Sequence, residues 1–119
     1  MNNPPGVLPS IADRFTHIVS AIGNVEETLN GISEEELATD QVRRLALERL
    51  LEIASMASTH VPASLKAAAN MVDWQTIADI GDRLENTRVR IEAKVLWTIS
   101  RDKLIPLKSC AERYLREPA

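Results

Sequence analysis

The sequence predicts an all-α protein, a bundle of four to five helices arranged up and down. Apolar residues recur at steps of three and four along most of the 119-residue chain, and no stretch shows the alternation of a strand. Hydrophobic residues make up 45% of the chain and aromatic residues only 3%, so Leu, Ile, Val and Ala must build the core. Such cores are usual in helical bundles.

A single helical domain is expected over residues 10–116, with a flexible lead-in at 1–9 and a tail at 117–119. The lead-in contains two Asn, three Pro and no charged residue, so it cannot serve as a signal peptide. No apolar run is long enough to cross a bilayer. We therefore expect a cytoplasmic protein that has no membrane contact.

The first predicted helix begins after Ser10, an N-cap candidate with Asp13 three residues later in the capping-box position. It is expected to end near Asn30-Gly31, because glycine commonly follows a helix. One apolar stripe runs along it and consists of Ile11, Phe15, Ile18, Val19, Ile22, Val25 and Leu29.

A second capping box, Ser33 with Glu36, starts a short helical turn that continues through Leu37. Asp40 then caps a long helix, which should stop near Val61-Pro62 because proline forces its predecessor out of helical geometry. The residues of this helix expected to face the core are Val42, Leu45, Ala46, Leu50, Ile53, Ala54 and Ala57.

Residues 63–70 are expected to form a short helix, and Asp73 caps a further one that bears Trp74, Ile77, Ile80 and Leu84. The last helical region should start near Ile91 and continue to Leu115, with a kink or restart at Pro106. Its apolar residues are Val95, Trp97, Ile99, Leu104 and Leu107, and both tryptophans are interpreted as core or interface anchors.

Few residues suggest chemistry by themselves. The net charge of −3 lacks the basic surplus that RNA-binding proteins usually carry. Cys110 is the only cysteine, so the chain has no internal disulfide, and we expect a buried or half-buried thiol. His17 and His60 are expected in structural or surface positions. No metal-ligand spacing or glycine-rich phosphate loop occurs, so we expect no metal and no cofactor.

Four stretches, in order and with regular spacing, resemble one known family. Residues 13–18 resemble its "R-L…I" start, 51–62 resemble "LEIISEASRHLP", 73–77 resemble "PW-x-x-I", and 90–107 resemble "RID…VW…DLPPL". Over residues 9–115 the chain thus resembles the HepT-like toxins of the HEPN ribonuclease superfamily. The resemblance implies a helical homodimer.

The family's motif is "R-N-x-L-x-H-x-Y", or "G-N-R-L-R-H-x-Y" in the branch nearest this chain. The resemblance implies metal-independent RNA cleavage where two subunits meet, with the His moving a proton and the Arg stabilising phosphate charge. It also implies a nucleotidyltransferase (MNT-like) antitoxin as partner, which adenylylates the motif Tyr.

This chain departs from the motif at most polar positions. Gly81 falls at the Arg, Asp82 at the Asn, Asn86 at the catalytic His and Arg88 at the Tyr, while Arg83 and Leu84 match the nearest branch. Met56 stands where the family's "SEA" has its acidic residue. The catalytic set is therefore predicted not to be intact.

Two functions follow from these departures. The first is a catalytically inert HepT-like protein of a toxin–antitoxin system that acts by dimerisation and partner binding. The alternative is an active RNA endonuclease toxin that uses Arg83 and Arg88 around Asn86, with Arg90 as a further phosphate contact. An unrelated role for a helical bundle, such as phosphotransfer on a histidine, is a third possibility.

Overall fold

The computed structural model describes residues 8–86 and 90–117, and within these ranges it contains helices and no strand. The all-α bundle predicted from the sequence is confirmed. The elements are α1 (Ile11–Leu29), α2 (Glu34–Thr39), α3 (Gln41–Thr59), α4 (Ala63–Ala68), α5 (Trp74–Glu85), α6 (Ala93–Thr98), the π-helical segment η1 (Ile99–Lys103) and α7 (Leu104–Arg116).

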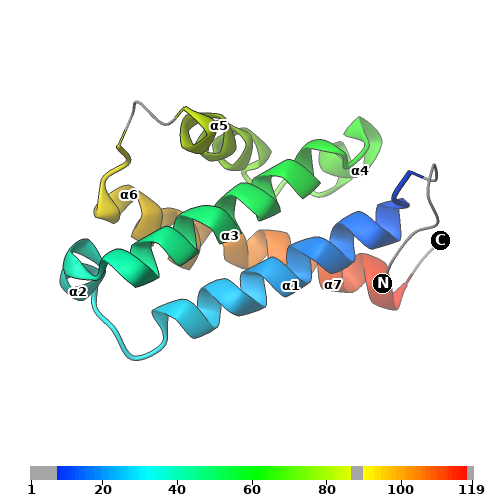
Figure 1. Cartoon of the computed structure of the whole chain (residues 1–119). Coiled ribbons are helices and arrows are strands. Elements are labelled where there is room, and N and C mark those ends of the chain that lie inside the picture. Colours follow the sequence, from blue (N-terminus) through cyan, green and yellow to red (C-terminus); the bar gives the residue numbers. More distant parts are fainter. Residues whose placement is uncertain (1–7, 87–89, 118–119) are drawn as a thin grey trace.

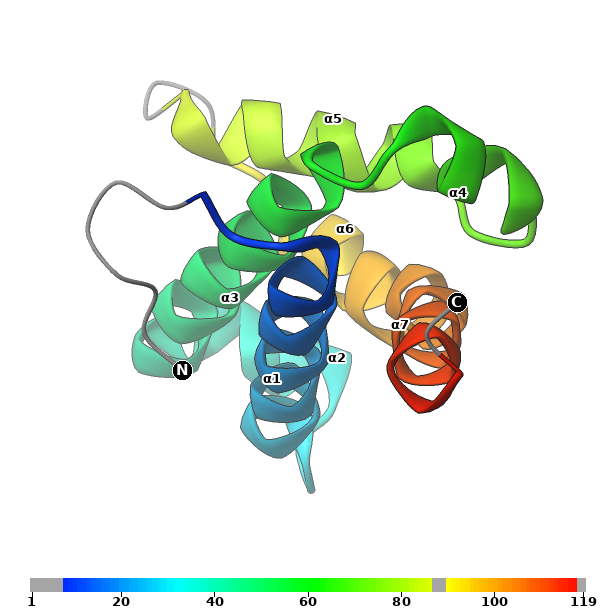
Figure 2. The same ribbon diagram turned by 90° about the vertical axis from the view of Figure 1, so that its right-hand side faces the viewer.

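Two long antiparallel helices, α1 and α3, form the centre of the bundle (Figure 1). Helix α7 packs along α1, and α5 packs across α3 on another side (Figure 2). The short helix α2 packs against α6. Between them lies a core of aliphatic side chains and one aromatic ring, whose fully buried members include Phe15, Ile18, Leu29, Leu37, Leu47, Leu51, Ile77, Ile91, Leu96, Leu104 and Leu107.

The four predicted N-caps are confirmed. Ser10 and Ser33 each form a complete capping box, in which the hydroxyl accepts from a backbone N–H and a carboxylate accepts from the cap. The Oδ1 atoms of Asp40 and Asp73 each accept from a backbone N–H three residues later, at 3.1 Å. Gly31 has a φ of 78° after α1, a left-handed conformation that glycine adopts without strain.

The predicted core face of α3 is partly wrong. Val42 and Leu45 are 78% and 54% exposed, and Ala46 is exposed as well, whereas Leu47 and Leu51 are buried. Helix α3 carries apolar residues on two opposite sides, so periodicity alone could not show which side meets α1 and α5. Of the other residues expected in the core, Ala54 and Ala57 are buried and Leu50 and Ile53 are half-buried.

The last helical region also differs from the prediction. Ile91 is buried but lies before α6, and the expected break at Pro106 occurs earlier, at η1. The backbone N–H of Leu104 donates to the carbonyl of Ile99, five residues back, which is the π-helical pattern. Proline has no N–H and its ring clashes with the carbonyl four residues before it. The wider turn directly before Pro106 accommodates this clash.

Candidate functional site

The motif-equivalent residues lie in the last turns of α5 and just beyond it. Gly81 and Asp82 belong to the helix, which ends at Glu85, and Asn86 is its C-cap residue. Arg88 lies outside the described residues. Arg90 comes shortly before α6 and is exposed. The site is therefore the end of one helix and the chain that follows it.

Gly81 is buried at the crossing of α5 and α3, directly against Ser55. A Cβ atom added at Gly81 would lie 2.6 Å from the Cβ of Ser55 and closer still to its hydroxyl oxygen. Real Cβ atoms essentially never approach that closely, and a Cβ cannot rotate away from its backbone. A larger side chain at position 81 therefore requires the two helices to separate.

This packing changes the interpretation of Gly81. Glycine is the first letter of the nearest branch's pattern, and the serine opposite it belongs to the stretch at 51–62 that resembles the family. The pair allows α3 and α5 to approach closely, as small residues do at helix crossings. Gly81 is thus explained by the fold and gives no evidence of lost catalysis. The sequence could not reveal this because the two residues are far apart in the chain.

Asn86 falls at the position that the family resemblance assigns to the motif His. It is exposed, and its backbone N–H donates to the carbonyl of Arg83 at 3.2 Å, which ends the helix. An amide side chain does not titrate near neutral pH, so it cannot transfer a proton as an imidazole can. The departure at position 86 therefore has a direct chemical consequence.

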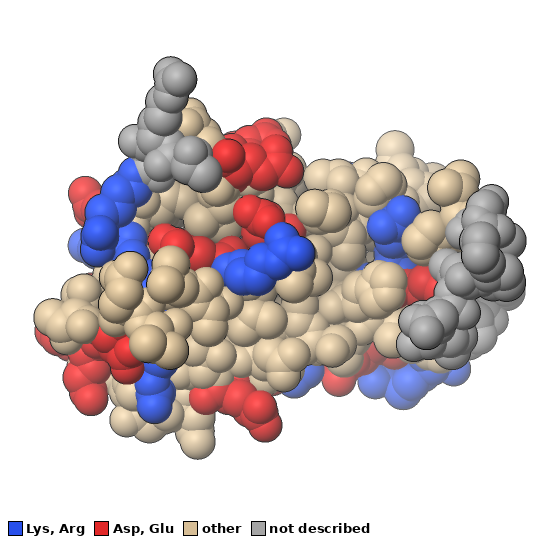
Figure 3. Space-filling view, in the orientation of Figure 1, with Lys and Arg blue, Asp and Glu red and all other residues tan. Residues whose placement is uncertain are grey.

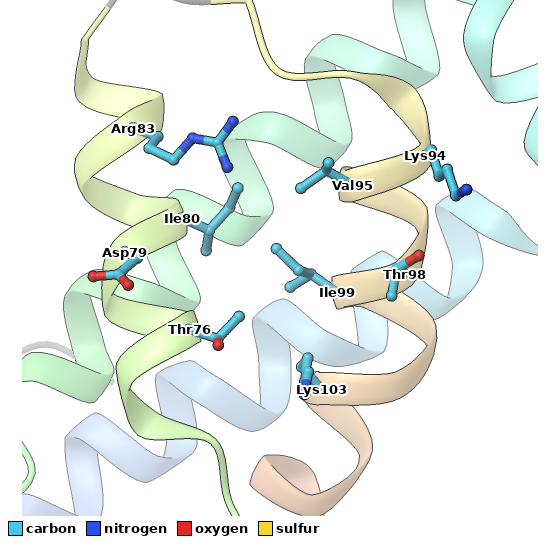
Figure 4. Close-up of a pocket in the computed structure, with 9 residues that line it drawn as sticks. All are labelled: Thr76, Asp79, Ile80, Arg83, Lys94, Val95, Thr98, Ile99 and Lys103. Carbon is cyan, nitrogen blue, oxygen red and sulfur yellow. The ribbon is translucent and has the colours of Figure 1, made fainter.

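Arg83 points into a groove between α5 and the α6–η1 segment (Figure 4). The groove has a volume of about 390 Å³, and Ile80, Val95 and Ile99 form its apolar floor. Two further cations line it, Lys94 and Lys103. The family resemblance pointed to Arg83 but to neither lysine, because the lysines come from separate elements that only the fold brings together.

The charged side chains that line this groove differ in whether they already have a partner within the chain. Lys103 donates to Asp73 at 3.1 Å, and Asp79 accepts from Gln75 at 2.8 Å. Within the described ranges, Arg83 and Lys94 have no ion pair. Arg83 therefore extends into the groove as a cation that can contact an anionic group, whereas the Lys94 side chain points away from Arg83 (Figure 4).

The other predicted contacts are not gathered at this groove. Met56 is 48% exposed on α3, one residue after the serine that contacts Gly81. Asp82 and Arg90 are exposed and do not line the groove. The motif-equivalent residues thus have three different surroundings. Gly81 is packed against α3, Asn86 is exposed at the end of α5, and Arg83 lies beside a groove.

Two shifted pKa values have clear causes. Hydrogen bonds from the Thr76 side chain and backbone, and from Lys103, lower the pKa of Asp73 at the start of α5. Burial raises the pKa of the half-buried Cys110 thiol, as expected for a cysteine with a structural role. Neither group lies among the motif-equivalent residues, so these shifts create no acid–base pair there.

The remaining candidates occupy structural or surface positions. His17 and His60 are exposed, and His60 is the C-cap residue of α3. The indole N–H of Trp74 donates to the carbonyls of Lys66 and Ala69 at 3.2 and 3.1 Å, which anchors α5 to α4. In the described part of the chain, no group of three His, Cys, Asp or Glu residues could hold a metal ion.

Comparison with known proteins agrees with this architecture. Residues 18–114 match the family described as ribonuclease HepT-like, and this range covers all the main helices in whole or in large part. The chain belongs to the HepT-like family. No described helix has the length and apolarity needed to cross a membrane.

Two relatives of this HepT-like chain carry ribonuclease names. A "Probable ribonuclease HepT" of Thermococcus cleftensis is 28% identical over 101 residues, which are 85% of this chain and 92% of that protein. A protein of Caldanaerobacter subterraneus subsp. tengcongensis with a provisional RNase name is 28% identical over 81 residues, 68% of this chain and 72% of that protein. No solved structure is significantly similar to the chain.

Proposed function

We propose that this HepT-like chain is a catalytically inert, cytoplasmic member of a toxin–antitoxin system that acts by binding. Its partners are a second copy of itself and an MNT-like nucleotidyltransferase antitoxin. The proposal rests on membership of a ribonuclease family combined with the loss of the residues that would perform the chemistry.

Asn86 is the observation that carries the proposal. RNA cleavage without a metal needs a group that takes and returns a proton beside the phosphate, and losing such a group typically costs about 10²–10⁴ in rate. The exposed C-cap amide cannot supply it. Met56, at the family's acidic position, cannot supply it either.

An RNA-cleavage assay tests inertness directly. The native chain is incubated with mixed RNA in EDTA, which excludes metal-dependent contaminants, and we expect no cleavage above background. The double variant Asn86→His, Arg88→Tyr rebuilds part of the motif and leaves Gly81 in place. We expect it to gain measurable cleavage. The matched control is Asn24→His, which adds a histidine at an exposed position on α1 and should gain nothing.

The same assay tests the alternative, an active endonuclease toxin. The cations that line the groove beside Arg83 favour it, because cationic side chains bind phosphate. If the native chain cuts RNA and either Arg83→Ala or Asn86→Ala abolishes the cutting, the alternative is correct and the proposal is wrong.

Partner binding needs a separate experiment. We expect the chain to co-purify with an MNT-like protein encoded beside it, and to leave growth unaffected when expressed alone. Growth arrest that the neighbouring gene relieves would contradict inertness but would support the toxin–antitoxin setting. Failure to co-purify would contradict the partner and leave the cleavage result unchanged.

A further inference from the structure

A second groove lies between α4 and α7, the two helices seen at the right of Figure 2. It shares no lining residue with the groove beside Arg83. Its volume of about 390 Å³ falls within the usual range of ligand pockets, about 300–1,000 Å³, so a small organic molecule fits. We define the α4–α7 groove by Leu65 and Ala68 of α4, by Met71, and by Pro106, Cys110 and Tyr114 of α7.

The α4–α7 groove is lined mainly by apolar side chains. Phe15, which is 1% exposed, lies at its base, and the Phe15 ring is 4.8 Å from the Tyr114 ring, measured between centroids. Leu65 and Pro106 are half-buried along it, and Met71 is 61% exposed. Apolar side chains around a hollow that is open to solvent favour a ligand with an apolar body, because its binding removes their surface from water.

Helix α4 adds no charge to this groove. The surface over α4 carries few charged side chains in Figure 3, whereas acidic and basic groups lie close together over the middle of α3. The charged residue of α4, Lys66, lies with its Nζ atom 5.7 Å from the centroid of the Trp74 ring, and it does not line the groove. Any charge that a ligand meets must therefore come from the side of α7.

Arg113 is the only cation among the described residues that line the groove. Its Nε atom lies 3.7 Å from a carboxylate oxygen of Glu117, and the two side chains are 75% and 72% exposed. A pair so exposed and so widely spaced contributes little, so a ligand carboxylate can replace Glu117 as the partner of Arg113. Burial raises the pKa of the Cys110 thiol and the charge of Arg113 lowers it, so the field of Arg113 reaches into the groove.

We propose that the α4–α7 groove binds a small amphipathic carboxylate, an aliphatic or aromatic acid. Its apolar body lies against Phe15, Leu65 and Met71, and its carboxylate meets Arg113 at the edge of the groove. An apolar hollow with one cation at its edge favours a ligand that has both parts in the same arrangement. The site is separate from the motif-equivalent residues, so the proposal is independent of whether the chain cuts RNA.

Cys110 allows the groove to be tested in the native chain. It is the only cysteine and is half-buried, so the rate at which iodoacetamide alkylates it reports how far the groove is filled. Intact mass gives this rate at mildly alkaline pH with increasing octanoate. We expect octanoate to slow alkylation until it saturates, octanol to slow it less, and octylamine, a cation, to slow it least. An unchanged rate with octanoate, or equal protection by octylamine, would overturn the proposal.

A pair of arginine variants tests the charge. Arg113→Ala should weaken octanoate binding about fivefold, the upper end for an exposed ion pair, and should leave octanol binding unchanged. The matched control is Arg116→Ala, on an exposed cation of the same helix that does not line the groove. Protection is compared with and without ligand in each variant, because Arg113 itself affects the thiol. Equal octanoate affinity in the two variants would show that Arg113 does not hold the carboxylate and would overturn the proposal.

A pair of alanine variants tests the location. Ala68→Trp places an indole in the groove and should abolish octanoate binding in titration calorimetry, with circular dichroism unchanged. The matched control is Ala67→Trp, on the neighbouring exposed alanine that does not line the groove, and it should bind octanoate as the native chain does. Octanoate binding that survives Ala68→Trp would place the ligand elsewhere and contradict the proposal.

A second copy of the chain is the competing occupant of this groove. In that case, alkylation of Cys110 without any acid should become faster when the native chain is diluted. We expect the rate constant to be the same at all micromolar concentrations of the chain. A rate constant that rises on dilution would assign the groove to a second copy, and the proposal would be wrong.

Discussion

Gly81 and Asn86 lie only five residues apart at the end of α5, yet their surroundings are opposite. Gly81 is buried against Ser55, where even one added carbon does not fit, whereas the Asn86 side chain is exposed. The first position is determined by helix packing, whereas the second is an exposed C-cap position. The fold therefore depends on the glycine at position 81 and does not depend in the same way on which residue stands at position 86.

The largest expected effect is a difference in the free energy of unfolding between alanine variants at two glycines. Gly81→Ala should lower the free energy of unfolding by about 1–3 kcal/mol, because it overpacks the crossing of α3 and α5. Gly23→Ala, in mid-α1, where the added carbon meets nothing within 4 Å beyond the chain neighbours and backbone of its own helix, should raise it by up to about 1 kcal/mol. Urea unfolding measures both changes. Equal stability of the two variants would show that the crossing is not tight.

A double-mutant cycle sharpens this comparison. Ser55→Gly removes both atoms that obstruct position 81, so it should recover about 1 kcal/mol or more of coupling energy in the Gly81→Ala background. Ser55→Ala keeps the Cβ atom and should recover less. Additive effects of Ser55→Gly and Gly81→Ala would mean that the two residues do not obstruct one another.

Asp73, at the start of α5, should make the stability of the protein depend on pH in the acidic range. The folded-state pKa of Asp73 is lowered, so its stabilising contribution is complete above the unfolded-state value and is lost as pH falls through the folded one. Native stability should therefore decrease below about pH 4, and Asp73→Asn should flatten part of that decrease. Thermal unfolding between neutral and acidic pH measures this. An equally steep decrease in the Asp73→Asn variant would contradict this prediction.

A smaller effect is expected at Asn86. Asn86→His should change the free energy of unfolding by no more than about 0.5 kcal/mol, as for most exposed positions. The measurement is the same urea titration as for Gly81→Ala. A loss of unfolding free energy as large as that of Gly81→Ala would contradict the contrast between positions 81 and 86.

No adenylylation is expected at the motif. The motif position for tyrosine is Arg88, and the single tyrosine, Tyr114, is half-buried on α7 with its ring 4.8 Å from that of Phe15. Incubation with an MNT-like partner and ATP should leave the intact mass unchanged. An AMP adduct mapped to residues 81–90 would contradict this.

Features of the fold that depend on neighbouring residues could be predicted from the sequence. The N-caps, the end of α1 at Asn30-Gly31 and the order of the helices are encoded by neighbouring residues, and all are confirmed. The exposed side of α3 was predicted wrongly, because Val42 and Leu45 follow the same spacing as a core face.

The candidate site was predictable only in part. Family resemblance located the end of α5, but the contact between Gly81 and Ser55 depends on how two helices cross. The cations beside Arg83 come from elements that are joined only in the folded chain. Such information has no local signal in a single sequence.

The π-helical segment has a consequence for how chain length can vary. Core residues normally follow one another at steps of three or four, whereas in η1 the neighbouring residues Ile99 and Ser100 are both buried and the next buried residue is Leu104. Segment η1 absorbs one surplus residue and keeps the helices on either side in phase with the same core. Removing one residue here would restore a regular step of four but return Pro106 to an ordinary helical turn, where its ring does not fit. The surplus residue and the proline therefore depend on each other, and a lineage that loses one is expected to lose the other.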